Sequence, residues 1–205
     1  EIAQCLVGSE MCIRDSRMIT AELGNVDAVC EILDARIPMS SRNPDVDELT
    51  AGKPRLIVLN RVDQADPEMT KKWAAYFRSL GYAVIETDAK QGGGVKQFSS
   101  AVRTLLRDKI ASYEAKGQIG RVLRVMVLGI PNVGKSTFIK RFMETQVIPN
   151  IDNVYRRERA KDELPQSGSG RMVMTAEPKF VPEEAVDIAL DEGSSCSVRL
   201  IDCVG

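Results

Sequence analysis

Short apolar runs alternate with amphipathic stretches along most of the chain. Apolar residues cluster in four runs bounded by polar residues, glycine or proline, at residues 27–35, 55–59, 82–86 and 123–129. Runs of this length and content predict buried β-strands. Two longer stretches, 67–81 and 95–117, have apolar residues at helical spacing and predict helices. Strands that alternate with helices predict a mostly parallel sheet with helices on both faces, which is an α/β fold.

Each of the two predicted helices has an apolar face among polar and charged residues. These faces are formed by Met69, Trp73, Phe77 and Leu80 in the first helix, and by Val95, Phe98, Val102, Leu105 and Leu106 in the second. Glycine at position 81 is the predicted stop of the first helix. A further helix is predicted to begin at the KST of residues 135–137, directly after the fourth strand and a glycine-rich loop.

The pattern changes after about residue 144. Residues 153–170 are charged and then rich in glycine and serine, which predicts a mobile or partner-ordered loop. Residues 172–175 and 179–182 are candidates for short edge strands, and residues 197–205 form another apolar strand that ends in Asp-x-x-Gly.

The first 16 residues show no sustained apolar periodicity and lack the basic start and apolar middle of a signal peptide. The stretch CLVGSEMCIRDS is similar to translated sequencing-adapter DNA. We interpret residues 1–16 as an artefact and exclude them from fold reasoning; a frayed N-terminal arm is the alternative.

Composition narrows the range of functions. The 28 basic and 29 acidic residues balance, so no overall basic field indicates a nucleic-acid partner, and DNA is not expected as one. A local RNA-binding face stays open, but composition does not argue for it. No apolar stretch reaches the roughly 18 residues of a membrane span. The five cysteines are scattered, which suits a reducing cytoplasm. The chain contains no histidine, which excludes an imidazole base and a histidine-ligated metal.

Residues 129–136, GIPNVGKS, match the phosphate-loop pattern GxxxxGK[ST] between a predicted strand and a predicted helix. Glycines let backbone N–H groups converge on phosphate oxygens at a helix N-terminus, where the helix dipole favours anions. Lys135 is expected to neutralise the β- and γ-phosphates, and the Ser136 hydroxyl to reach Mg²⁺. The alternative is a glycine-containing turn that matches the pattern by chance.

Residues 59–63, LNRVD, follow the second predicted strand, at the sheet edge where ligands bind in α/β proteins. The Asp63 carboxylate can accept hydrogen bonds from the N1–H and exocyclic amine of guanine, which adenine cannot supply. Asn60 is assigned to the same base reader. Arg61 stands where lysine is more usual, and its stem can pack across the base. Alone, N-x-x-D is also ordinary turn chemistry.

Residues 87–90, TDAK, follow the third predicted strand. A loop there can place the backbone N–H groups of Asp88, Ala89 and Lys90 near the guanine carbonyl. A plain turn before the glycines at 92–94 is an equal alternative.

The Mg²⁺ site is predicted from the last apolar strand. Asp202 ends that strand as a Walker-B aspartate does, and Gly205 can offer its amide to the γ-phosphate. Thr175 is the candidate switch threonine, with Thr145 as the competing choice. A strand-end aspartate without a ligand is the alternative for Asp202.

The predicted site has catalytic, metal-binding and nucleotide-binding residues. The candidate catalytic residues are Lys135 and Thr175. The candidate metal ligands are Ser136, Asp202 and Thr175. The candidate nucleotide-binding residues are Asn60, Arg61, Asp63, Asp88, Ala89, Lys90, Asn132, Val133, Gly134, Lys135, Ser136, Thr137 and Gly205.

The order of the motifs and several sequence stretches resemble those of a known family. Residues from about 17 to 140 resemble the circularly permuted GTPases of the YlqF/RbgA type, which act in large ribosomal subunit assembly. The stretches that carry the resemblance are 33–44 (LDARIPMSSRNP), 52–66 (GKPRLIVLNRVDQAD), 114–117 (EAKG) and 127–139 (VLGIPNVGKSTFI). The resemblance implies a three-layer P-loop NTPase fold, circularly permuted and here C-terminally truncated. It also implies binding of GTP, Mg²⁺-dependent hydrolysis and a precursor of the large ribosomal subunit, with its rRNA and proteins, as partner in the cytoplasm.

The later part of the chain resembles a different family. It is similar to stage IV sporulation protein A, a spore-coat scaffold whose P-loop domain uses ATP. The stretches concerned are 136–151, 159–170, 174–185 and 199–205. The alternative function is therefore an ATP-dependent, self-polymerising scaffold of the spore coat. We interpret the chain as two gene fragments joined near residues 134–140; a genuine fusion is the competing interpretation.

The predicted organisation is one P-loop domain over residues 17–205. Residues 17–117 form its base-reading half and residues 118–205 its phosphate-binding half. Within the second half, residues 141–205 have the character of the second family.

Overall fold

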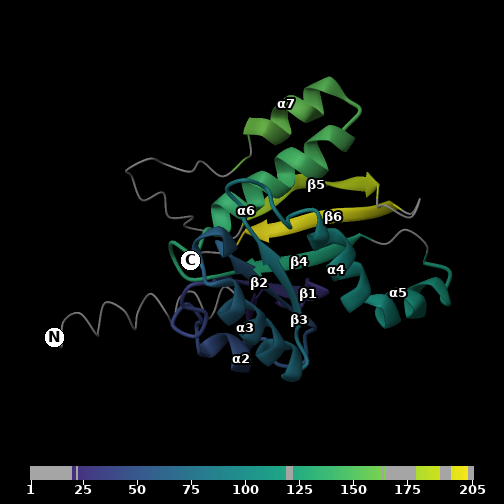
Figure 1. The fold of residues 1–205 in the computed structure, drawn as a ribbon. Helices are drawn as coiled ribbons and strands as arrows, with labels where there is room; N and C mark the ends of the chain where they lie inside the picture. The colour runs from purple at the N-terminus through teal and green to yellow at the C-terminus, as the bar shows by residue number, and fades with distance from the viewer. Residues whose placement is uncertain are drawn as a thin grey trace, which may run out of the picture.

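The computed structural model of the chain describes residues 20–21, 23–118, 122–162, 164, 179–189 and 195–202 (Figure 1). For residues 179–189 and 195–202 it describes the backbone.

A six-stranded sheet runs through the molecule in the order β3-β2-β1-β4-β6-β5 (Figure 1). Its strands are β1 (Ala28–Asp34), β2 (Arg55–Asn60), β3 (Ala83–Thr87), β4 (Leu123–Leu128), β5 (Lys179–Ala189) and β6 (Ser195–Asp202). The neighbours from β3 to β6 pair in parallel, and β5 pairs antiparallel with β6 at the edge. The phosphate-loop strand β4 is fourth along the chain but lies inside the sheet, beside β1. This is the expected circularly permuted P-loop arrangement, with a mostly parallel sheet.

Helices cover both faces of the sheet. Their bounds are α2 (Asp45–Leu49), α3 (Pro67–Ser79), α4 (Gln97–Leu105), α5 (Arg107–Glu114), α6 (Lys135–Phe142) and α7 (Val154–Asp162). Short helical turns span Val62–Gln64, Met143–Val147 and Ile148–Asn150. Buried side chains of α4 and α6 share one core cluster, whereas those of α2 and α3 lie in two clusters on the opposite face. The fold therefore has three layers, with the sheet between two layers of helices.

The side chains of the central strand β1 contribute to the cores on both faces of the sheet. All seven of its residues are buried, as expected for a parallel strand covered on both faces. Because side chains alternate along a strand, Cys30 and Ile32 enter the α4–α6 core. Val29 and Leu33 enter the cores under α2 and α3.

One aromatic cluster joins the first part of the chain to the second. Phe98 of α4 contacts Phe138 and Phe142 of α6 edge to face, with ring centroids 5.3 and 5.0 Å apart. All three rings are fully buried, with relative exposures of 0 to 1%. Edge-to-face pairs are a favoured geometry for buried aromatic rings. Residues that lie on either side of the phosphate loop therefore share a single core.

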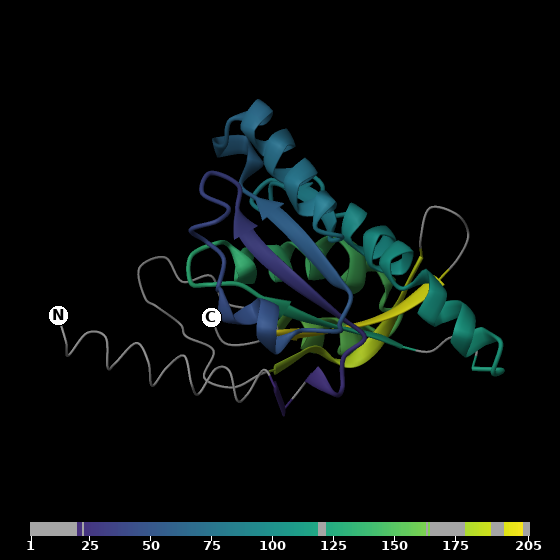
Figure 2. The same ribbon diagram turned by 90° about the horizontal axis from the view of Figure 1, so that it is seen from below.

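Two predictions about helices were wrong. The helix expected over 95–117 is broken at Leu106, whose φ of −101° and ψ of 12° are outside the helical range. Leu106 itself is buried, whereas the following α5 has no fully buried residue and its Ile110 packs against the core only partly buried. In Figures 1 and 2, α5 lies at the periphery of the molecule.

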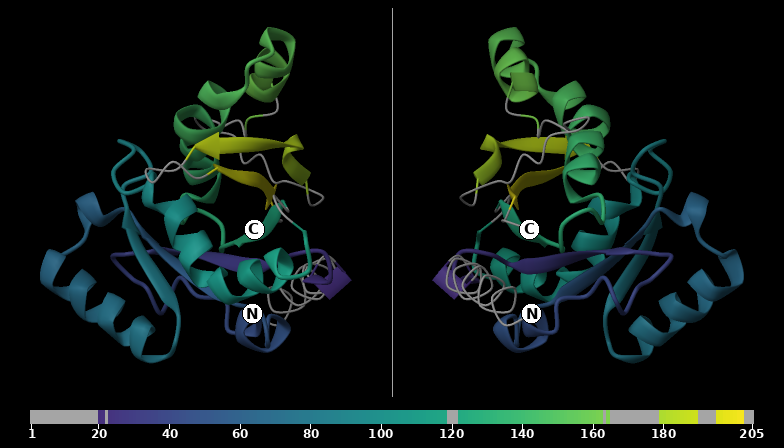
Figure 3. Two further views of the ribbon diagram at one scale, coloured as in Figure 1. Left: turned by 90° about the vertical axis from the view of Figure 1, so that its right-hand side faces the viewer. Right: turned by 90° about the vertical axis from the view of Figure 1, so that its left-hand side faces the viewer.

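Part of the loop expected over 153–170 is the helix α7. Its residues 154–162 are charged but have no helix breaker, and Ala160 is buried against the α4–α6 core. In Figures 1 and 3, α7 lies at the end of the molecule next to β5 and away from α3. The edge strand expected at 179–182 extends to Ala189, and the one expected at 172–175 lies outside the described residues.

The apolar face predicted for the first helix is partly exposed. The helix itself is confirmed as α3, and Phe77 is completely buried. Met69 and Leu80, however, each keep 48% of their surface exposed. The buried face is instead completed by Thr70 and Ala74, whose smaller side chains allow the helix to approach the sheet.

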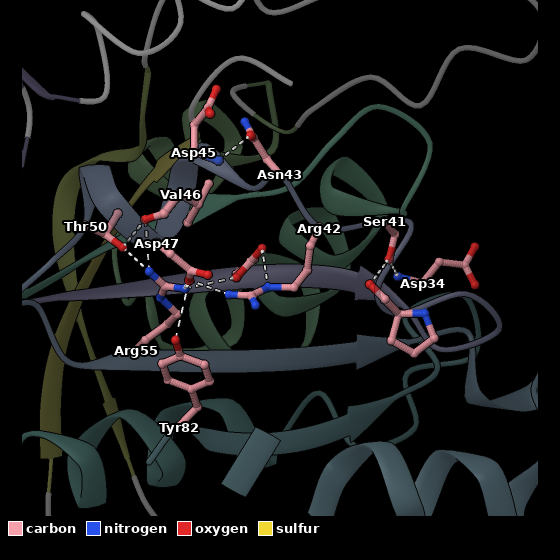
Figure 4. A network of polar contacts seen from close by, with 12 residues as sticks. Asp34, Ser41, Arg42, Asn43, Asp45, Val46, Asp47, Thr50, Arg55 and Tyr82 are labelled. Atoms are coloured by element: carbon pink, nitrogen blue, oxygen red, sulfur yellow. Dashed lines mark hydrogen bonds and ion pairs between the residues drawn. The ribbon is translucent and has the colours of Figure 1, made fainter. Parts of the chain in front are cut away.

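A charged network fixes the segment between β1 and β2 on the α2–α3 face (Figure 4). Asp47 of α2 accepts hydrogen bonds from Arg42 and Arg55, and Arg55 also donates to the Val46 carbonyl at 2.9 Å. Both guanidinium groups lie within 3.6 Å of the buried Glu31 carboxylate. Burial raises the pKa of Glu31 even though both arginines act to lower it.

We predict that Phe98→Ala lowers the free energy of unfolding by about 3–5 kcal/mol, because it opens a cavity between α4 and α6. Urea unfolding followed by the fluorescence of Trp73, the only tryptophan of the chain, reports on the α3 side. Far-UV circular dichroism reports on the whole chain. Both midpoints should fall together.

The matched control is Met69→Ala, which truncates a half-exposed side chain and should change stability by less than about 1 kcal/mol. Two separate transitions, or a Trp73 transition that Phe98→Ala does not move, would contradict a shared core.

Candidate nucleotide-binding site

Three loops meet at the carboxyl edge of the parallel sheet. They follow β2, β3 and β4 and contain residues 61–66, 88–94 and 129–134 respectively. Parallel strands present all their carboxyl ends at one edge, which is where α/β folds bind ligands. The predicted base reader and the predicted phosphate loop, 73 residues apart in the sequence, are therefore neighbours in space.

The phosphate loop has the backbone that its glycines predict. Gly134 precedes α6 with φ of +94°, and Asn132 also has a positive φ of 67°. Lys135 is the first residue of α6 and is buried, with 8% exposure. A helix start leaves its first N–H groups without partners inside the helix, so they can bind an anion. The loop and the eight-residue α6 thus fit a phosphate group.

The Asn60 side chain joins all three loops. Its amide nitrogen donates to the Val133 carbonyl of the phosphate loop at 2.9 Å. Its amide oxygen accepts from the Thr87 hydroxyl at 3.2 Å and from the Ala89 N–H at 3.1 Å. Asn60 is 2% exposed, so these bonds form away from solvent. The Asn60 amide therefore braces the site from within.

Gly134 is required by the position of Asn60. A Cβ atom at residue 134 would lie 2.4 Å from the Asn60 amide nitrogen. No carbon can approach that closely, and the positive φ of Gly134 independently disfavours a side chain. The glycine of the phosphate loop and the asparagine of the base reader are thus mutually fitted.

Arg61 makes a second bridge between the same loops. It has φ of 64° and donates to the Asn132 carbonyl of the phosphate loop. Its other terminal nitrogen lies 3.4 Å from the Asp34 carboxylate. Arg61 is thus held from two sides, with part of its side chain, 32%, exposed.

Asp34, at the end of β1, organises the charges beside the base reader. The backbone N–H, Nε and Nη2 of Arg36 all donate to its carboxylate, the two side-chain bonds at 2.9 and 2.7 Å. The Arg36 hydrogen bonds lower the pKa of Asp34, with help from the charge of Arg61. Arg36 also donates to Gln64, whose amide donates to the Asp63 carboxylate at 3.3 Å. Asp63 itself is exposed.

The loop of residues 88–94 is a closed turn. Asp88 and Gly93 form a bridge, and the Asp88 carboxylate accepts from the N–H groups of Lys90 and Gln91. Gly94 closes the turn at φ of +73°, where a Cβ atom would lie 2.1 Å from the Glu86 carbonyl oxygen. The backbone N–H groups predicted to face guanine, those of residues 88–90, all have acceptors within the chain.

Arg141 of α6 reaches the same turn from the phosphate side. Its Nε lies 3.4 Å from the Ala89 carbonyl oxygen, and its Nη2 donates to the Lys90 carbonyl. The turn is therefore held by β2 through Asn60 and by α6 through Arg141.

The remaining predicted site residues lie in α6, at the end of β6 or outside the described part of the chain. Ser136 and Thr137 are half-buried in the first turn of α6. Asp202 ends β6, and its Cα pairs with that of Val127, two residues before Gly129. The backbone thus brings Asp202 to the phosphate loop. Thr175 and Gly205 lie outside the described residues, as do residues 1–16; the adapter interpretation of those residues stays a prediction.

Sequence reasoning did not single out Asp34, Arg36 or Arg141. Asp34 and Arg36 had a weak signal, because they follow a buried strand at the ligand-binding edge. Arg141 had none, since helix position alone does not show that its side chain crosses to another loop. Thr87 was noted only as part of a four-residue turn, whereas its hydroxyl bonds the buried Asn60 amide.

Comparisons with known proteins find both expected families. The chain is 44% identical to ribosome biogenesis GTPase A of Bacillus cereus over 136 residues, which is 66% of this chain and 46% of that protein. It is 62% identical to stage IV sporulation protein A of Bacillus anthracis over 79 residues, 38% of this chain and 16% of that protein. Residues 110–205 match the family of the stage IV sporulation protein A ATPase domain. Both resemblances are confirmed.

The chain spans less than half the length of each of these curated relatives. The two aligned lengths, 136 and 79 residues, together exceed the 205 residues of the chain, so the two alignments share residues. Among solved structures, the GDP-bound structure of TM YlqF is 26% identical, with a TM-score of 0.48, covering 91% of this chain and 56% of that one. No helix in the described part of the chain is long and apolar enough to cross a membrane.

We predict that Asn60→Ala lowers the free energy of unfolding by about 2–4 kcal/mol, because it leaves the Val133 carbonyl and the Ala89 N–H buried without a partner. Urea unfolding measures this change. The control is Asn150→Ala, which removes an exposed amide that donates to Gln146 at 2.7 Å and should cost less than about 1 kcal/mol. Equal effects of the two substitutions would refute the bracing role of Asn60.

Proposed function

We propose that the chain is a GTP-binding, Mg²⁺-dependent GTP hydrolase. The observation that carries the proposal is the junction of the NRVD loop with the GKS loop, in which Asn60 and Arg61 both bond the phosphate-loop backbone. The covalent links between base and phosphates limit how far apart the two groups of a nucleotide can lie. A site for guanosine triphosphate therefore needs a base reader and a phosphate cradle that are locked together.

Each part of the site would contribute separately. Asp63 would accept the two guanine N–H groups, and Arg61 would lie along the base. The amides of the phosphate loop and the Lys135 ammonium group would hold the β- and γ-phosphates. Asn60 would act by keeping the two loops in register.

The residues at the phosphate loop also suit a Mg²⁺ ion. Hard oxygen ligands are what Mg²⁺ requires, and the Ser136 hydroxyl with an Asp202 carboxylate is such a set. Thr175 and Gly205 remain candidates from sequence alone. A Mg²⁺ ion held there would supply positive charge that neutralises the phosphate oxygens.

We further propose that the cellular role is assembly of the large ribosomal subunit in the cytoplasm, with a subunit precursor as partner. Support comes from the 136-residue similarity to a protein named ribosome biogenesis GTPase A. That similarity covers 66% of the chain, against 38% for the similarity to stage IV sporulation protein A, which is why it is favoured.

A second candidate function is an ATP-dependent, self-assembling scaffold of the spore coat. It is favoured by the match of residues 110–205 to the ATPase domain of stage IV sporulation protein A. The two candidates share the phosphate loop and differ in the base that they require.

Competition binding on the whole chain separates the candidates. A fluorescent GTP analogue is displaced by GTP or by ATP in the presence of Mg²⁺. The proposed function predicts that GTP displaces it at a concentration at least about 100-fold below that of ATP. Preference for ATP, together with ATP-dependent polymers that sediment, would favour the scaffold. Equal displacement would refute guanine recognition.

We predict that Asp63→Ala weakens GTP binding at least about 100-fold, because two charge-assisted hydrogen bonds to guanine are lost. ATP binding should change less than about threefold, since the phosphate loop is unaltered. The control is Glu68→Ala, an exposed carboxylate in the next helix. A variant at position 63 that still prefers GTP would show that Asp63 does not read the base.

A further inference from the structure

We propose that Arg141 is a positioning residue for guanine recognition: it fixes the turn of residues 88–94, which bonds Asn60 at the start of the base-reading loop, to the helix that begins at the phosphate loop. The proposal rests on the proposed function for its ligand. Its structural part, the restraint of the turn by Arg141, stands on contacts within the chain.

The guanidinium group of Arg141 faces two consecutive carbonyl groups. Its Nε lies 3.4 Å from the Ala89 oxygen, and its Nη2 donates to the Lys90 oxygen. A planar fork of donors matches such a pair, which a single ammonium group does not. The aliphatic stem also packs on the turn, because a Cβ atom at Gly92 would lie 3.5 Å from the Arg141 Cδ.

These contacts complete the restraint of the backbone around Ala89. In the peptide unit before Ala89, the N–H donates to Asn60 and the Asp88 carbonyl accepts from Gly92 at 2.7 Å. In the peptide unit after Ala89, the N–H of Lys90 donates to Asp88, and the Ala89 carbonyl faces Arg141. Both peptide planes are therefore held at both ends, and Arg141 supplies the one hold that comes from α6.

Rigid placement of this turn matters for binding because a turn that moves must be ordered when the ligand arrives. The Arg141 side chain is 36% exposed, and its ion pair with the equally exposed Glu144 spans 3.6 Å. An exposed ion pair of this length does not by itself set the direction of the guanidinium group. The two carbonyl groups of the turn set that direction.

The test uses four forms of the whole chain: wild type, Arg141→Ala, Arg141→Lys and the control Lys140→Ala. Lys140 is the neighbouring cation on α6 and reaches Glu144 at 4.0 Å. Hydrogen exchange of the peptide that covers residues 87–94 measures restraint of the turn without any nucleotide. Competition binding measures affinity for GTP and for inorganic tripolyphosphate, which occupies a phosphate loop but has no base.

Arg141→Ala should speed exchange at Ala89 and Lys90 and weaken GTP binding about 10-fold, with tripolyphosphate affinity changed less than about twofold. Arg141→Lys keeps the charge but not the fork, so most of the loss should remain. Lys140→Ala should leave exchange and GTP affinity unchanged.

Three results would overturn the proposal: unchanged exchange in Arg141→Ala, equal weakening of GTP and tripolyphosphate, or full GTP affinity in Arg141→Lys. A wild-type chain that fails to prefer GTP over ATP would instead overturn the proposed function. In that case the exchange data alone still decide whether Arg141 restrains the turn.

Discussion

One buried amide holds the site together. The carboxyl ends of β2, β3 and β4 lie at the same edge, but loops at one edge are not by themselves in register. Asn60 supplies the register by bonding Val133 on one side and Thr87 and Ala89 on the other. Burying the amide costs little free energy because its hydrogen bonds are made. Removing it costs much more, because its partners are then left buried and unpaired. Gly134 must then be a glycine, because a Cβ atom there would overlap the amide.

The chain carries two kinds of similarity, yet its described part is one fold. The phosphate loop belongs to both kinds, which explains how a single sheet accommodates them. β4 pairs with β1 on one side and with β6 on the other, in continuous parallel register. The α6 helix completes the junction, since its phenylalanines pack on Phe98 and its Arg141 reaches the turn after β3.

Local patterns were sufficient to predict much of the fold. The strand runs and α3 follow from apolar content and from clear stop signals such as Gly81. The break at Leu106 could not be predicted, because residues 95–116 contain no glycine or proline and Ile110, beyond the break, still packs against the same core. α7 was missed because a highly charged sequence resembles a loop unless the burial of Ala160 is known.

For the site, motif and spacing alone predict that the two loops meet at one edge of the sheet. They could not show that Asn60 bonds Val133, Thr87 and Ala89, that Arg36 reaches Gln64 beside the base reader, or that Arg141 reaches the turn after β3. Such contacts depend on where loops distant in sequence finally lie. Sequence identifies chemical types at an edge, whereas only the packed fold determines which of them touch.

The permuted order of the strands has a consequence for how the chain is made. A ribosome releases the base-reading strands first, and Val133, which Asn60 must bond, follows 73 residues later. At about 5–20 residues per second this is a delay of roughly 4–15 s. During that time β1, a strand whose residues are all buried in the final fold, has an open edge where β4 will pair. An uncovered strand edge invites pairing with other chains, so the nascent protein is most vulnerable to aggregation just before its phosphate loop emerges.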